Sequence, residues 1–136
     1  MNRTDIEQRL AKAPMDGVVS VYLFGSVAEG RSHAESDVDL GVLLDWNRFA
    51  DSAMRFEKRV SLSSELATTA VAFDVVILND APPQLASRIV TEGFRIFCSD
   101  SEADHNFRRD AQLKAADLEP FLRRMRRIKL EALAKQ

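Results

Sequence analysis

Short apolar runs alternate with longer stretches of helical periodicity, and this alternation constrains the fold more than any other feature of the sequence. Four runs are rich in β-branched and aromatic residues and are too short to be buried helices, so they are predicted to be strands. They span 18–24, 37–44, 71–78 and 94–98. Such an alternation is typical of an α/β (α+β) fold in which helices flank a small mixed sheet.

Helices are expected before, between and after these runs. Their expected segments are 5–12, 26–30, 46–69, 82–91 and 101–135. Thr4 and Glu7 have the spacing of a capping box at the first of them. In the last, C-terminal helix, Pro120 predicts a kink or a break because proline lacks the N–H that the helix needs.

Composition places the chain among soluble globular proteins. Its 136 residues suit one domain, residues 1–136, which can bury a core without a disulfide or a structural metal. Hydrophobic residues make up 46% and charged residues 29% of the chain, and the net charge is −2. A charge this small argues against a nucleic-acid-coating protein, so direct contact with nucleic acid is not expected.

The cysteine count and the hydropathy pattern indicate a cellular compartment. Cys98 is the one cysteine, so an internal disulfide is excluded. No apolar run approaches the roughly 18 residues that a membrane span needs, and the N-terminus leads into a charged helix. A cytoplasmic protein without membrane contact is therefore expected.

Gly25-Ser26 ends the first apolar run where a short helix is expected to begin. Glycine permits close backbone approach, and the start of a helix presents free N–H groups. Together with the Ser26 hydroxyl, these groups would suit an anionic phosphate. An ordinary turn with a serine cap has the same sequence, so this pair alone leaves both interpretations open.

Asp37 and Asp39 open the second run with one residue between them. Residues i and i+2 of a strand share a face, which here is opposite to the face of Val38 and Leu40. Two adjacent carboxylates repel each other, and a bound divalent cation relieves that repulsion. A pair of solvated acids at the end of a loop is the alternative, because aspartate is uncommon in strands.

Asp74 lies between Phe73 and Val75 in an otherwise apolar run. A carboxylate there is costly if it is buried without a partner. A metal site shared with Asp37 and Asp39 would explain it. The alternative is an edge strand in which Asp74 faces water.

Together these motifs resemble the nucleotidyltransferase superfamily typified by DNA polymerase beta, in its minimal nucleotidyltransferase (MNT) form. The resemblance rests on GSVAEGRSHAESDVDLGVLL at 25–44 and FDVVIL at 73–78. Many minimal members carry basic residues at the positions of Val27 and Glu29. Here both are non-basic, and Arg31 is the nearest cation.

The resemblance implies a site and a chemistry. Asp37, Asp39 and Asp74 would be the catalytic and metal-binding carboxylates, holding Mg²⁺ in a two-ion arrangement. Gly25 and Ser26 would bind the phosphates of ATP. An acceptor hydroxyl would then attack the α-phosphorus in line, and pyrophosphate would leave.

The acceptor is implied by family resemblance alone. A solo domain of this size is similar to the antitoxins of HEPN/MNT toxin–antitoxin systems, which transfer AMP from ATP to a tyrosine of a partner HEPN ribonuclease toxin. A hetero-oligomer with such a toxin is therefore expected. Two alternatives stay open: an aminoglycoside-type nucleotidyltransferase with a separate substrate-binding subunit, and a non-catalytic module that masks a toxin.

A basic run in the last helix also has two interpretations. It comprises Arg123, Arg124, Arg126, Arg127 and Lys129, interrupted by apolar residues. It could be a solvated helix end that complements the helix dipole. It could equally contact an acidic partner, or RNA held by a partner.

Overall fold

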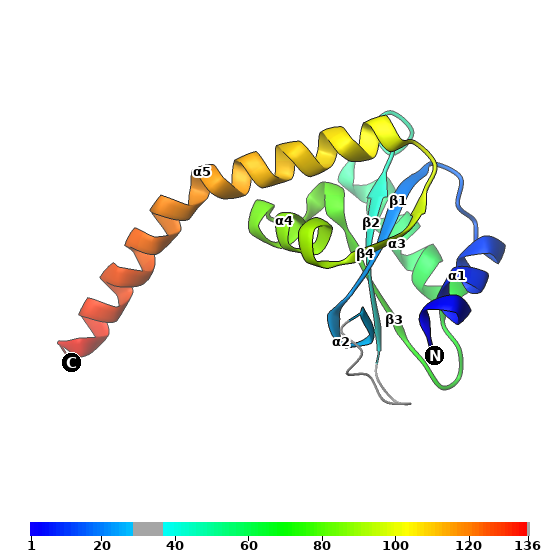
Figure 1. Ribbon diagram of the computed structural model, residues 1–136, viewed down its shortest axis with the longest axis horizontal. Coiled ribbons are helices and arrows are strands. Elements are labelled where there is room, and N and C mark those ends of the chain that lie inside the picture. The colour runs from blue at the N-terminus through cyan, green and yellow to red at the C-terminus, as the bar shows by residue number, and fades with distance from the viewer. Residues whose placement is uncertain (29–36, 136) are drawn as a thin grey trace.

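The computed structural model describes residues 1–28 and 37–135 (Figure 1). Its elements are, in order, α1 (Arg3–Lys12), β1 (Val18–Phe24), α2 (Gly25–Ala28), β2 (Val38–Leu44), α3 (Ser52–Leu66), β3 (Phe73–Ile77), the 3-10 turn η1 (Leu78–Asp80), α4 (Pro83–Glu92), β4 (Phe94–Cys98) and α5 (Ser101–Ala134). The small mixed sheet, its flanking helices and the C-terminal helix confirm the predicted fold class. Arg31 and Glu29 lie outside the described residues.

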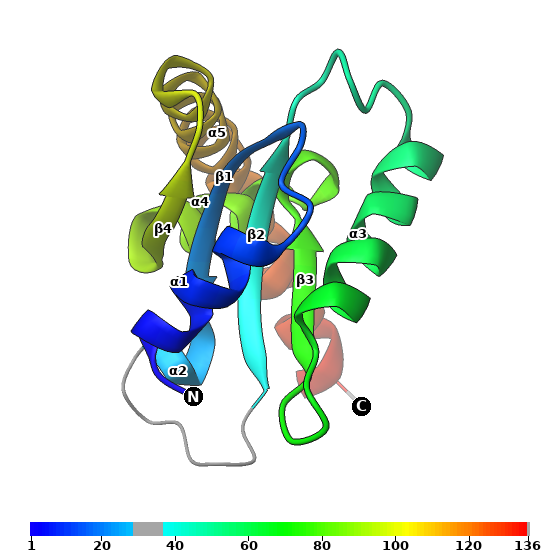
Figure 2. The ribbon, with the colours of Figure 1, turned by 90° about the vertical axis from the view of Figure 1, so that its right-hand side faces the viewer.

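The four strands form one sheet in the order β3-β2-β1-β4. β1 is antiparallel to β2 and to β4, whereas β2 and β3 are parallel and are joined through α3. The end of β1 therefore meets the starts of β2 and β3 at one end of the sheet, where α2 also lies (Figure 2). Because β1 and β2 are antiparallel, the chain reverses its direction at this end of the sheet. The crossover from β2 to the parallel strand β3 then brings the start of β3 to the same end.

Helices cover both faces of the sheet. On one face, Ile6 of α1 and Leu62 of α3 pack with Leu40 of β2 in the larger hydrophobic cluster. On the other face, Ile89 of α4 packs with Leu43 in a second cluster. Alternate residues of β2 thus belong to different cores, as the alternation of side chains along a strand requires.

Two helices begin at positions other than those predicted. The capping box of α1 uses Asn2 and Asp5, so Thr4 and Glu7 were the wrong pair. α3 begins at Ser52, not at residue 46, and Asp51 accepts a hydrogen bond from Met54 N at 2.8 Å. Short polar side chains that bond nearby backbone N–H groups favour turns and caps over a helix interior, which explains the later start of α3.

α5 continues through Pro120 without a break. The helix bends partway along its length (Figure 1), as a proline inside a helix causes. Its first half packs on α4 and β1, with Ala111 and Ala115 buried. Beyond Ala115 none of its described residues is buried, and the helix projects from the body of the molecule. In the described part of the chain no helix is long and apolar enough to cross a membrane.

A buried polar cluster joins α5 to β1. Asp104 is fully buried and accepts hydrogen bonds from Ser20 Oγ at 2.6 Å and Tyr22 OH at 2.7 Å. Arg95 on β4 donates to the other carboxylate oxygen at 2.9 Å, and Arg108 donates to Tyr22 OH at 3.0 Å. Burial alone would raise the pKa of Asp104, but the three donated hydrogen bonds hold it below its ordinary value. The cluster therefore keeps Asp104 ionised inside the fold.

Candidate active site

Two of the three predicted carboxylates lie side by side in the sheet. Asp39 is the second residue of β2, Asp74 is the second residue of β3, and the two are direct partners in the parallel ladder. Their neighbours Val38 and Phe73 belong to the core on the other face, so both carboxylates project from the face that α4 covers. Asp37 directly precedes β2, two residues before Asp39.

Burial and two neighbouring acids act on the carboxylate of Asp39. Burial raises the pKa of the half-buried Asp39 above its ordinary value, and the negative charges of Asp74 and Asp37 raise that pKa further. Asp37 and Asp74 are exposed. β3 is indeed an edge strand with Asp74 facing solvent, as the simpler alternative supposed, but the strand register also places Asp74 next to Asp39.

Gly25 packs directly against Asp39. It directly follows Phe24, the partner of Asp39 in β1, and has a φ of 78°, in the left-handed region that favours glycine. A Cβ atom at this position would overlap the Asp39 carboxylate. Only glycine allows both this backbone conformation and this close approach. Ser26 follows as the second residue of the four-residue α2.

The chemistry of this group suits a small hard cation. Carboxylate oxygens are the ligands that Mg²⁺ and Mn²⁺ prefer. Burial, and after it the charges of Asp74 and Asp37, raise the pKa of Asp39, and a bound cation would offset all of these effects. Within the described residues, however, no three acidic, histidine or cysteine side chains are gathered as a ready ligand set. The strand register thus brings Asp39 and Asp74 together as a pair of acids.

A hollow of about 220 Å³ lies beside Gly25. Phe24 and Ala28 form one side, and Leu85, Arg88 and Ile89 of α4 form much of the other. Sequence reasoning did not include these α4 residues in the site. The amphipathic pattern of 82–91 indicates a helix that packs on the sheet, but it does not reveal which of its residues lies next to Gly25.

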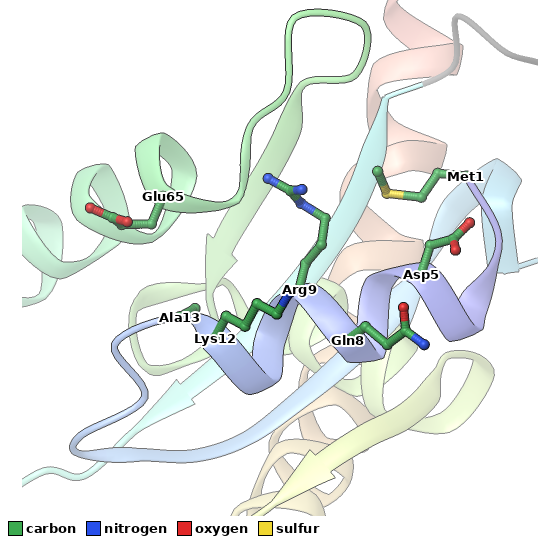
Figure 3. A pocket seen from close by; sticks show the side chains of 7 residues that line it. All are labelled: Met1, Asp5, Gln8, Arg9, Lys12, Ala13 and Glu65. Carbon is green, nitrogen blue, oxygen red and sulfur yellow. The ribbon is translucent and has the colours of Figure 1, made fainter.

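A larger hollow of about 520 Å³ lies elsewhere, between α1 and the end of α3 (Figure 3). Arg9 extends from α1 into this region and donates to the carbonyl oxygens of Leu66 at 2.8 Å and Ala67 at 3.3 Å. These bonds satisfy carbonyls at the C-terminal end of α3, so Arg9 has a structural role. None of the residues that line this larger hollow also lines the hollow beside Gly25.

Comparison with known proteins identifies a family for most of this fold. Residues 5–102 match the family model described as "Polymerase beta, Nucleotidyltransferase". The chain is also 31% identical over 94 residues to the Protein adenylyltransferase MntA of Shewanella oneidensis. That alignment covers 67% of this chain and 64% of the relative, so the chain spans less than two thirds of the relative's length.

Solved structures share the arrangement of elements. A toxin–antitoxin structure with AMP-PNP matches with a TM-score of 0.63 and 26% identity, covering 94% of this chain and 98% of the other. A tri-AMPylated HEPN toxin of Shewanella oneidensis in complex with its MNT antitoxin matches with a TM-score of 0.59 and 23% identity. This second match covers 96% of this chain and 98% of the other, and at this identity it supports the fold alone.

Proposed function

The chain belongs to the polymerase beta nucleotidyltransferase family, and from that premise we propose that it transfers AMP from ATP to a tyrosine hydroxyl of a HEPN ribonuclease toxin. It would act in the cytoplasm as the antitoxin of the pair, in a complex with that toxin. The observations that carry the proposal are the pairing of Asp39 with Asp74 across two strands and the close approach of Gly25 to Asp39. These three residues, which the sequence resemblance assigns to the family's motif, lie near one another at one end of the sheet, and this supports the proposal.

Each motif residue has a role in the proposed reaction. Asp37 and Asp39 would hold Mg²⁺ with Asp74, and Gly25-Ser26 would bind the terminal phosphates at the turn. Mg²⁺, as a pair of ions when bound, would neutralise the triphosphate and the attacking hydroxyl. Asp74, which is exposed on the edge strand, would receive the proton of the acceptor hydroxyl.

The proposed reaction transfers the adenylyl group of ATP to the tyrosine oxygen. The tyrosine oxygen forms a bond to the α-phosphorus of ATP, the bond from that phosphorus to the bridging oxygen of the β-phosphate breaks, and pyrophosphate departs. Positioning and charge neutralisation supply most of the acceleration in such a reaction. The carboxylates and the tight Gly25 turn are the groups in this chain that could provide both.

Two comparisons support adenylyl transfer over other nucleotide chemistry. The curated relative is named a protein adenylyltransferase, and a similar toxin–antitoxin structure contains an ATP analogue. The tyrosine and the HEPN partner follow from the family resemblance. Because the chain spans only 64% of the curated relative, acceptor and nucleotide both require direct measurement.

An acceptor assay tests this function. The purified chain is incubated with Mg²⁺, α-labelled ATP and the protein encoded by the neighbouring gene, and both proteins are followed by intact mass and peptide mapping. We expect one or more adenylyl groups on a tyrosine of the neighbour. Label on an added aminoglycoside instead would favour the small-molecule alternative, and no transfer from any of the four nucleotides, with toxin still inhibited, would favour the binding module.

A further inference from the structure

Arg88 of α4 lines the same hollow as the turn at Gly25, and the proposed reaction assigns it no role. Of the described residues that line this hollow, Arg88 is the one cation and Glu92 is the one anion. The turn itself contributes no charged side chain, because residues 25–28 are glycine, serine, valine and alanine. A side-chain cation at the turn would therefore come from another element, and α4 presents Arg88 there.

Close packing fixes the position of α4 over the sheet. A Cβ atom at Gly41 of β2 would overlap the side chain of Ile89, and one at Gly93 would overlap the carbonyl oxygens of Ile89 and Leu23. These two glycines let the helix lie closer to β1 and β2 than larger residues would permit. Because Arg88 directly precedes Ile89, its backbone is held beside the hollow, while its side chain is mostly exposed.

The guanidinium of Arg88 is held by a single weak contact. Its Nε donates to Glu92 Oε2 at 3.2 Å, and the two side chains are 74% and 67% exposed. An exposed pair of this kind contributes little, because water and salt screen it. Within the described chain the two terminal nitrogens of Arg88 donate no hydrogen bond, whereas every guanidinium nitrogen of Arg55 donates to Asp80 or to Phe49 O. Arg88 therefore retains its terminal N–H groups for a ligand.

The charges at this end of the sheet indicate which ligand suits Arg88. Asp37, Asp39 and Asp74 are acidic, and the triphosphate of the proposed reaction would bring further negative charge to them. Arginine forms paired, charge-assisted hydrogen bonds with phosphate oxygens, and these are stronger than a single exposed bond to a carboxylate. The hollow, at about 220 Å³, is smaller than pockets that enclose a whole drug-sized ligand, so it suits part of a nucleotide.

We propose that Arg88 is a substrate-binding residue that holds the terminal phosphates of the nucleotide, exchanging its bond to Glu92 for bonds to phosphate oxygens. This assignment rests on the proposed function, since it takes the nucleotide to be a triphosphate bound at the Gly25 turn. Glu92 then acts as a competitor, because its carboxylate accepts from the same guanidinium and repels the phosphates. Arg88 would thus favour a nucleoside triphosphate over a monophosphate, which has no terminal phosphates to offer.

Equilibrium binding of the ATP analogue AMP-PNP and of AMP to the purified chain, with Mg²⁺ and at constant ionic strength, tests this role. Arg88→Ala should raise Kd for AMP-PNP by about tenfold or more, as for a lost charge-assisted contact, and Kd for AMP by less than about threefold. Arg88→Lys should fall between, because lysine keeps the charge but not the planar fork. Glu92→Gln should lower Kd for AMP-PNP by about two- to threefold, because the competing charge is removed.

Arg123→Ala is the matched control. Arg123 lies on the projecting half of α5, is likewise 74% exposed, and likewise donates from Nε to a glutamate four residues away, Glu119, at 3.0 Å. Its loss should leave both Kd values within about twofold of the wild type. Thermal unfolding of all variants checks that they fold as the wild type does, which the exposure of both arginines predicts.

The outcomes separate this inference from the proposed function. Equal Kd for AMP-PNP in the wild type and Arg88→Ala would overturn the assignment alone, and so would an equal rise in Kd for AMP and AMP-PNP. Binding of AMP-PNP that depends on Arg88, without AMP transfer to a tyrosine, would support the assignment and contradict the proposed acceptor. A wild-type chain that binds no AMP-PNP would contradict both.

Discussion

Single side chains in this protein show two opposite ways of accommodating a carboxylate. Asp104 is fully buried, yet three donated hydrogen bonds keep its pKa below the ordinary value. Asp39 is half-buried, accompanied by other acids, and has a raised pKa. In the first arrangement, hydrogen bonds from the protein itself stabilise the charge, and the carboxylate has a structural role. In the second, burial and the neighbouring negative charges both raise the pKa, a combination that is frequent at functional sites.

Asp104→Asn tests the structural role. The substitution removes a charge-assisted bond from Arg95 and disturbs the bonds from Ser20 and Tyr22, so we expect a loss of about 2–3 kcal/mol in unfolding free energy at pH 7. Because the folded-state pKa of Asp104 is depressed, its stabilisation is complete above the unfolded value of about 3.9 and is lost as the pH falls through the folded value.

Denaturant unfolding of both proteins at neutral and acidic pH measures this contribution. The difference between wild type and Asp104→Asn should narrow below about pH 4. Asp110→Asn, an exposed neighbour on α5, should stay within about 0.5 kcal/mol of the wild type. An equal difference at both pH values would show that the ionised form of Asp104 contributes nothing.

Tyr22 offers a direct optical test of the same cluster. Burial raises the pKa of Tyr22 to about 12, even though the hydrogen bond from Arg108 lowers it. Tyr22 is the one tyrosine in the sequence, so phenolate absorbance reports on it alone. The titration midpoint should lie near 12 in the folded protein and near about 10 in denaturant. Equal midpoints would mean that Tyr22 is not enclosed as described.

At the scale of elements, β1 has a glycine next to each of its two ends. Gly17 precedes the strand and Gly25 follows it, and both have a φ of 78°. A Cβ at Gly17 would overlap the ring of Phe49, whereas one at Gly25 would overlap the Asp39 carboxylate. The same backbone conformation therefore brings Gly17 against an aromatic side chain and Gly25 against a carboxylate of the candidate site.

The pair Gly25→Ala and Gly17→Ala separates these consequences. Each should lose about 1–2 kcal/mol of stability, because alanine is strained at positive φ. Only Gly25→Ala should also reduce AMP transfer, by about 100-fold, since it displaces Asp39. Thermal unfolding and transfer rates of both variants measure the two effects. Equal rates of AMP transfer by the two variants would show that Gly25 is not part of the site.

The sequence predicted the existence of the elements better than their ends and contacts. The apolar run around Asp74 was identified as a strand, but that run does not show that β3 lies parallel to β2 with Asp74 beside Asp39. That register depends on the crossover through α3. Likewise the predicted helix over 46–69 is too long, because apolar periodicity does not reveal that Asp45 accepts hydrogen bonds from Asn47 N at 2.8 Å and Arg48 N at 3.1 Å, which hold these residues in a turn before α3.

At the scale of the whole molecule, the fold consists of a layered body and a projecting half of α5 (Figure 1). The body brings Gly25, Asp39 and Asp74 to one end of its sheet, and the sequence motifs singled out these residues although they did not reveal the register that joins them. The projecting half of α5 was not predictable, because an amphipathic pattern is the same whether the apolar face meets the body or another protein.

Metal-dependent AMP transfer by single carboxylate variants tests the central claim most directly. Transfer to the acceptor is measured with Mg²⁺ and with a chelator, for the wild type, Asp37→Asn, Asp39→Asn and Asp74→Asn, with Asp110→Asn as the control. We predict transfer only with Mg²⁺, reduced by about 100-fold or more in each of the three variants and unchanged in the control. Transfer that persists in chelator, or in all three variants, would contradict the account.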